Sequence, residues 1–108
     1  MQIFHIATLT DWERAGESGA YTTSSLGRSL EDEGFLHAAH RRQLAAVFQR
    51  YYTDVRKPLV LLTIDTDRLE VPWHEDEVGE ETFPHIYGPL HPSAVVDVQP
   101  LDELGGTL

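Results

Sequence analysis

The pattern of apolar and polar positions predicts six strands and two helices in the order β-α-β-α-β-β-β-β. In residues 2–8, QIFHIAT, the two-residue period of a strand places Ile3, His5 and Ala7 on one face and Phe4 and Ile6 on the other. The continuous apolar run PLVLLTID, residues 58–65, is typical of a central strand buried on both faces. The remaining expected segments are strands at 34–38, 71–75, 83–87 and 94–101, a short strand or loop at 21–26, and a helical turn at 66–69.

Capping and periodicity predict the two helices. Thr10 and Glu13 have the spacing of a capping box, which predicts a helix over residues 11–17 that Gly19 ends. A longer helix is expected over residues 40–53, because a 100° rotation per residue gathers four side chains on one apolar face. These four are Leu44, Val47, Phe48 and Tyr51.

This element order favours an α+β fold in which two helices pack against a small mixed or antiparallel sheet. The length of 108 residues is that of a single domain, and we expect a core over about residues 2–101 with a flexible tail at 102–108.

The charge balance limits the partners. Eighteen acidic against eight basic residues give a net charge of −10, which argues against binding to DNA, RNA or anionic membrane surfaces. A small anionic ligand remains compatible, because one local basic cluster can hold it. Neither a membrane-length apolar run of about 18 residues nor a signal-peptide pattern is visible, and cysteine is absent, so we expect a cytoplasmic protein. The sequence carries no signal for the oligomeric state.

Two predicted strands share a pattern of aromatic and imidazole side chains. Phe35 is two residues before His37, and Phe83, His85 and Tyr87 alternate in the same way, so each set shares one face of its strand. Rings that stack beside groups that hydrogen-bond suit a pocket for a planar heterocycle. The alternative is ordinary cross-strand packing near a sheet edge, with Pro84 marking that edge.

The basic stretch His40-Arg41-Arg42 begins the longer predicted helix. Helical phase relative to Leu44 places His40 and Arg41 beside the inward face and Arg42 toward solvent. Arg41 near free helix N–H groups would suit a phosphate or carboxylate. The alternative is an ion pair between Arg41 and the acidic residues 31–33.

We interpret the acidic run of residues 75–81 as mainly a solvated surface. Glu81 is the exception, because it immediately precedes the strand that carries His85, and it is a candidate general base or electrostatic stabiliser. No nucleophile motif or phosphate-binding glycine loop is present. Spacing does not bring the possible metal ligands together, so no metal site is predicted. Those ligands are His37, His40, Glu75, Glu81, His85 and His91.

The segments FHIAT, GFLH, LVLLTID and ETFPHIYGPL, in this order, resemble the bacterial domain-of-unknown-function family 952 over nearly the whole chain. Members of that family are similar in fold to ADP-ribosyltransferases, whose cleft between parts of a split sheet binds NAD. The resemblance therefore implies an ADP-ribosyltransferase-like fold with a nucleotide-sized cleft.

The resemblance also implies roles for single residues. His5 stands where such enzymes hold part of the nucleotide, Ser25 or Phe35 where they use a second binding residue, and Glu81 near their catalytic glutamate. His37 is kept from the family's strand-to-helix pattern, and with Glu81 it is the candidate catalytic residue. Ala39 replaces a serine, and at a helix N-cap it would leave an N–H group unpaired at a cost of about 1 kcal/mol.

Three functions are open at this point. The first is an enzyme or degenerate enzyme that acts on NAD or an ADP-ribosyl group in a cleft lined by His5, His37, His85 and Tyr87, with Arg41 on a phosphate. The second is a non-catalytic module that binds a small anionic metabolite in the same cleft. The third is a protein-interaction domain. The sequence leaves the ligand, and whether any reaction occurs, undecided.

Overall fold

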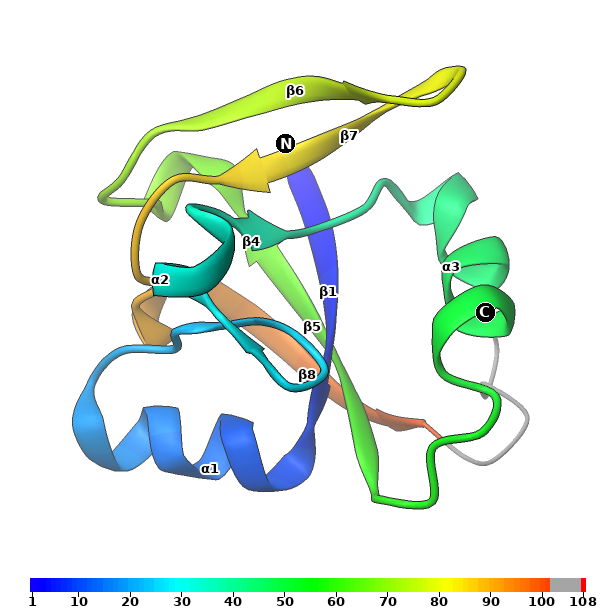
Figure 1. The fold of residues 1–108 in the computed structure, drawn as a ribbon. Helices are drawn as coiled ribbons and strands as arrows, with labels where there is room; N and C mark the ends of the chain where they lie inside the picture. The colour runs from blue at the N-terminus through cyan, green and yellow to red at the C-terminus, as the bar shows by residue number, and fades with distance from the viewer. Residues whose placement is uncertain (102–107) are drawn as a thin grey trace.

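Two three-stranded antiparallel sheets form the framework of the protein in the computed structural model, which describes residues 1–101 and 108 (Figure 1). The first sheet has the order β1-β5-β8, comprising Gln2–Thr8, Leu59–Asp65 and Val95–Leu101. The second has the order β4-β7-β6, comprising Leu36–His37, Glu81–Ile86 and Trp73–Val78. A small hairpin pairs β2 and β3, Thr23–Ser25 and Arg28–Ser29.

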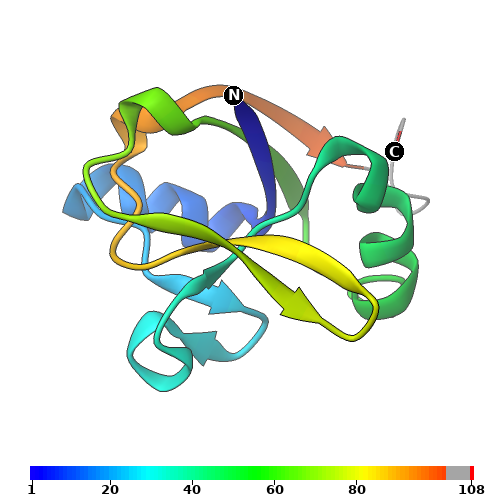
Figure 2. The same cartoon turned by 90° about the horizontal axis from the view of Figure 1, so that it is seen from above.

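Within the described residues, three α-helices and three 3₁₀ turns connect the strands, and Figure 2 shows the same arrangement turned by 90°. The helices are α1 Leu9–Ser18, α2 Leu30–Glu33 and α3 Leu44–Tyr51, and the turns are η1 Arg41–Gln43, η2 Thr66–Arg68 and η3 Pro92–Ala94. None of the helices in the described part of the chain has the length and apolar character that a membrane crossing requires.

The first sheet separates two apolar clusters, because β1 and β5 are buried on both faces. Ile3 and Ala7 of β1 belong to the cluster that includes Ala15 of α1. Phe4 and Ile6 belong to the other cluster, which includes Leu44 and Phe48 of α3. The two helices therefore cover opposite faces of this sheet. The predicted alternation of residues 2–8 and the doubly buried strand at 58–65 are confirmed.

Residues 36–39, which we call the joint, hydrogen-bond to both three-stranded sheets. The Ala38 N–H donates to the Pro84 carbonyl of β7 at 3.0 Å. The next residue, Ala39, pairs with Phe4 of β1 through two hydrogen bonds of 2.8 and 2.9 Å. Both alanines are buried where the two sheets meet. The joint thus fixes one sheet against the other.

The sheets differ from the sequence prediction in two ways. Every strand pair in the described residues is antiparallel, so the mixed alternative is wrong. Pro84 lies in the central strand β7 and does not mark an edge. A residue of a strand points its N–H and its carbonyl to the same side. The Pro84 carbonyl faces Ala38, where the pairing of β4 with β7 ends, so the N–H that Pro84 lacks also falls at the end of that ladder, and the proline is tolerated.

The helix starts also differ. Thr8, and not Thr10, caps α1 by accepting from the Asp11 N–H at 3.1 Å, so that helix begins at Leu9. The expected helix over residues 40–53 is a 3₁₀ turn followed by α3. Ala39 is not the N-cap: its backbone pairs with Phe4 in the joint, and the residue that precedes the 3₁₀ turn is His40, whose N–H donates to the Gln43 side chain at 2.8 Å.

The C-terminal Gly19 of α1 adopts φ 87°, as expected for a helix-ending glycine. Of the expected tail at 102–108, residues 102–107 lie outside the described residues. Leu108 packs beside the cluster that contains Phe48.

The position of the α1 cap can be tested by mutation. Thr8→Ala removes the hydroxyl oxygen that accepts from the Asp11 N–H in the first turn of α1. We expect this change to lower the free energy of unfolding by about 1 kcal/mol. The matched control Thr10→Ala changes an exposed residue and should stay within about 0.5 kcal/mol of the parent. Urea unfolding of both variants measures this, and equal losses would contradict the assigned cap.

Candidate functional site

A cleft of about 430 Å³ opens between the β2–β3 hairpin, α3 and the turn end of the β6–β7 hairpin. Its polar lining consists of Ser25, Arg28, Glu33, His37 and His85. Its apolar lining consists of Leu26, Ala38, Val47, Tyr51, Tyr52, Val78 and Phe83. Aromatic walls with a few convergent polar groups are the usual composition of a small-molecule site.

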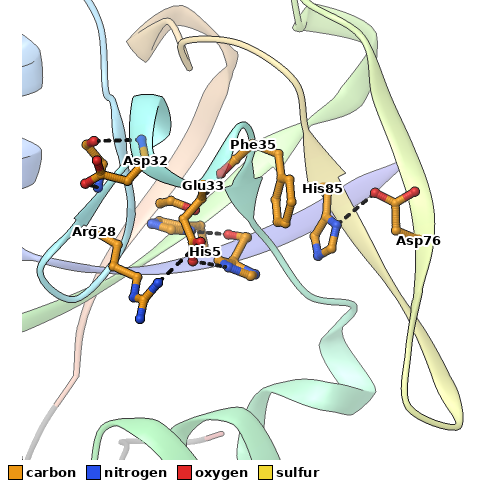
Figure 3. Close-up of polar contacts among 10 residues, drawn as sticks. His5, Arg28, Asp32, Glu33, Phe35, Asp76 and His85 are labelled. Atoms are coloured by element: carbon orange, nitrogen blue, oxygen red, sulfur yellow. Dashed lines mark hydrogen bonds and ion pairs between the residues drawn. The ribbon is translucent and has the colours of Figure 1, made fainter.

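Two histidines stand opposite each other on this cleft. His37 of β4 and His85 of β7 are direct partners in the antiparallel register, and their rings meet edge to face with centroids 5.2 Å apart. The Phe35 ring stacks on His85, with ring centroids 4.0 Å apart and an interplanar angle of 15°. Figure 3 shows the two rings beside each other. The aromatic and imidazole side chains therefore share one sheet face, as the two-residue period predicts.

The His85 ring is oriented by a carboxylate. Its Nδ1 donates to Asp76 Oδ2 of β6 at 2.9 Å (Figure 3). The Tyr87 hydroxyl donates to the same oxygen. These two hydrogen bonds, that from Tyr87 first, lower the pKa of Asp76, so the carboxylate is ionised at neutral pH. Burial lowers the pKa of His85 despite the opposing effect of Asp76. His85 is accordingly neutral, with its proton on Nδ1.

The His37 ring contacts a different carboxylate at the cleft. Its Nε2 lies 3.3 Å from Glu33 Oε1 of α2, and the other Glu33 oxygen lies 3.6 Å from the Arg28 guanidinium. Arg28 is mostly exposed, and exposed pairs of this kind contribute only about 0–1 kcal/mol. Arg28 can therefore turn toward a bound anion at little cost.

The backbone of His37 is supported from behind by a buried histidine. His5 Nδ1 donates to the His37 carbonyl at 2.5 Å, and the Tyr21 hydroxyl donates to His5 Nε2 at 2.9 Å. A carbonyl only accepts, so the proton of neutral His5 must be on Nδ1. Burial lowers the pKa of His5 to about 4 and raises that of Tyr21. His5 is thus a neutral support behind the cleft wall.

Three polar side chains of residues 40–43, just before α3, contact the β6–β7 hairpin, and we call these contacts the clamp. They include a hydrogen bond of 3.3 Å from Gln43 to Glu81. His40 Nε2 lies 2.7 Å from Glu75, Arg42 donates to Glu81 at 2.8 Å, and the buried Gln43 donates to the Thr82 carbonyl at 2.9 Å. Hydrogen bonds from Arg42 and then Gln43 lower the pKa of Glu81. The clamp brings two walls of the cleft together.

The structure brings four of the predicted site residues to the cleft: Ser25, His37, Phe83 and His85. Phe35 and Tyr87 contact His85 or its partner Asp76, while His5 lies behind His37. His40 and Glu81 belong to the clamp. The roles of all these residues in binding or catalysis stay predictions.

The helical phase predicted for the basic stretch is wrong, because residues 41–43 form a 3₁₀ turn and not an α-helix. A 3₁₀ turn has three residues per turn, which changes the direction of each side chain. The Arg41 guanidinium lies over the Phe4 ring at 5.4 Å, not on the cleft. Arg42 is exposed as expected but pairs with Glu81, and Gln43 is the residue that points inward.

Several residues of the site are absent from the sequence prediction. Arg28 and Glu33 come from the β2–β3 hairpin and α2, Tyr52 follows α3, and Asp76 meets His85 only through the β6–β7 register. The strand predicted over 71–75 ends before Asp76, whereas β6 continues to Val78. The alternation of His74 and Asp76 on a longer strand is the signal that could have indicated a polar strand face. Within residues 1–101 and 108, no three His, Asp or Glu side chains gather as metal ligands.

These features define a small α+β protein with two antiparallel three-stranded sheets and a cleft between the β2–β3 hairpin, α3 and the β6–β7 hairpin. A family model described as "Protein of unknown function (DUF952)" matches residues 6–98, and the chain belongs to this family. No curated protein matches the chain significantly.

Solved structures of one bacterial protein are similar to this chain. The crystal structure of protein CC0527 from Caulobacter crescentus, a structural-genomics target, has 25% sequence identity and a TM-score of 0.77, covering 94% of this chain and 87% of that one. Its solution NMR structure has 26% identity and a TM-score of 0.72, covering 94% and 84%. The likeness extends over almost the whole α+β framework.

Burial of His5 predicts a pH-dependent stability. The pKa is about 4 in the folded protein against 6.5 when free, so the unfolded state binds more protons between these values. The free energy of unfolding should therefore fall as pH is lowered from 6.5 to 4, by up to about 3 kcal/mol from this group. Urea unfolding across this range measures the slope.

The matched variants for this test are His5→Gln and His74→Gln. The first should lose this part of the slope whatever its absolute stability, whereas the second alters an exposed histidine and should keep it. An unchanged slope in His5→Gln would show that His5 is protonated in the folded state.

Proposed function

We propose that the cleft binds a nucleotide-sized anionic ligand of the ADP-ribose or NAD type. The observation that carries this proposal is the pairing of His37 and His85 on the wall of a 430 Å³ cleft that also holds Arg28 and several aromatic rings. Aromatic faces suit a planar base, and an arginine suits a phosphate. The family resemblance to ADP-ribosyltransferases supports the same ligand class.

The charge distribution supports a small ligand over a polymer. A net charge of −10 disfavours binding to a nucleic-acid backbone or an anionic membrane, which requires an extended basic surface. One lightly held guanidinium in the cleft is enough for a single phosphate group. Binding without turnover is favoured, because Glu81, the expected catalytic carboxylate, is held in the clamp by Arg42.

Titration with ADP-ribose, NAD and nicotinamide tests the proposal. Binding is measured from the NMR signals of the cleft residues and from thermal shift. Arg28→Gln should weaken ADP-ribose binding roughly tenfold, because a charge-assisted hydrogen bond to phosphate is lost. The control Arg14→Gln removes an exposed arginine of α1, on the other side of the first sheet, and should leave affinity unchanged. Silence of His37, Phe83 and Arg28 signals at millimolar ligand would refute the proposal.

Cleavage of the bond between ribose and nicotinamide is a second candidate, favoured by the Glu33 carboxylate beside His37 in the cleft. Such a carboxylate can stabilise the positive charge that develops on the ribose. Glu33→Gln should then reduce nicotinamide release about 100-fold, while the control Glu13→Gln, which changes an exposed carboxylate of α1 outside the cleft, should change it less than about twofold. Absence of nicotinamide release by the parent protein would exclude cleavage and leave binding.

A further inference from the structure

We propose that His85 is the hydrogen-bond acceptor of the cleft, that it acts through Nε2, and that Asp76 and Tyr87 are the positioning residues that keep this nitrogen unprotonated. The proposal rests on the proposed function for its ligand: it implies that the ligand presents a hydroxyl or N–H donor to the sheet wall, as a ribose does. It assigns a specific role to two residues, Asp76 and Tyr87, that do not line the cleft.

The first support is the position of His85 Nε2. The side chain is 4% exposed and lines the cleft, yet Nε2 has no hydrogen-bond partner among the described residues. Leaving a buried polar atom without a partner costs about 1–3 kcal/mol, so native structures keep few of them. A donor from a ligand would recover this cost, which makes the atom a natural point of contact.

The second support is the tautomer. An ionised carboxylate only accepts hydrogen bonds, so the contact between Asp76 and Nδ1 requires the imidazole proton on Nδ1. Nε2 then carries a lone pair. Tyr87 donates to the same carboxylate oxygen, which holds Asp76 ionised and in place. In water, imidazole favours the opposite tautomer, so the arrangement selects the form that can accept from a ligand.

The third support is the environment of the His85 ring. Phe35 stacks on one face, and the half-exposed His37 ring stands perpendicular to His85. The charged and titratable groups that face His85 are Asp76 from β6 and His37 from β4, and Tyr87, which follows β7, contacts the same Asp76 oxygen. Burial and His37 disfavour a charged His85, and only Asp76 opposes them, so the acceptor form persists at neutral pH.

Histidine ¹⁵N NMR of the ligand-free protein tests the tautomer directly. We expect His85 to show a protonated Nδ1 and an unprotonated Nε2 at pH 7. Asp76→Asn should move a large share of the proton to Nε2, because an amide can donate to Nδ1. The control Asp97→Asn changes an exposed carboxylate on β8 and should leave the signals as in the parent. A parent protein with the proton on Nε2 overturns the proposal without any ligand.

ADP-ribose is the probe for the acceptor role. Its binding should shift the His85 Nε2 resonance, and Asp76→Asn should raise the dissociation constant about 3- to 10-fold, the loss expected for one hydrogen bond. Should Asp76→Asn not fold, the Nε2 shift in the parent protein still decides the question. Movement of Phe83 and Arg28 signals with a stationary Nε2 overturns the acceptor role and leaves the proposed function standing. Silence of all three overturns both.

Discussion

The backbone of residues 36–39 holds this protein together, because its hydrogen bonds serve two sheets in turn. Leu36 and His37 pair with β7, the Ala38 N–H still reaches β7, and Ala39 pairs with β1. Two consecutive alanines fit this place, since a larger side chain would separate the sheets that they join. The same four residues carry the His37 side chain into the cleft, so the geometry of the site is fixed by the geometry of the joint.

Local periodicity was enough to predict the strands that form the core. The alternation of residues 2–8 and the apolar run that ends at Asp65 depend only on burial, which a sequence displays directly. The aromatic and imidazole side chains of β4 and β7 were likewise placed on one face by period alone. Start positions failed where a competing partner decided them. Thr8 caps α1 two residues before the predicted Thr10, and Ala39 pairs with Phe4 in the joint, so that His40 and not Ala39 precedes the 3₁₀ turn.

Strand periodicity also predicted part of the site, because it determines which side chains share a face. His37, Phe83 and His85 come from strands whose faces a sequence reveals. Arg28, Glu33 and Asp76 reach the cleft or its histidines through pairings between distant segments, and no local pattern specifies those pairings. The excess of acidic residues also takes a different meaning in the structure. Around the cleft, carboxylates orient imidazole and guanidinium groups, so part of the negative charge serves as a scaffold for the site and only the remainder as a solvated surface.

The clamp separates the shape of the cleft from the stability of the core. Side-chain contacts of His40, Arg42 and Gln43 help to set how far α3 stands from the β6–β7 hairpin, together with Phe83, which packs on the cluster that contains Leu44 and Phe48. Polar contacts at a surface can be exchanged one at a time at small energetic cost, whereas buried apolar residues must change together. Members of one family could therefore widen or narrow this cleft, and with it change the ligand, while the two sheets and their joint stay the same.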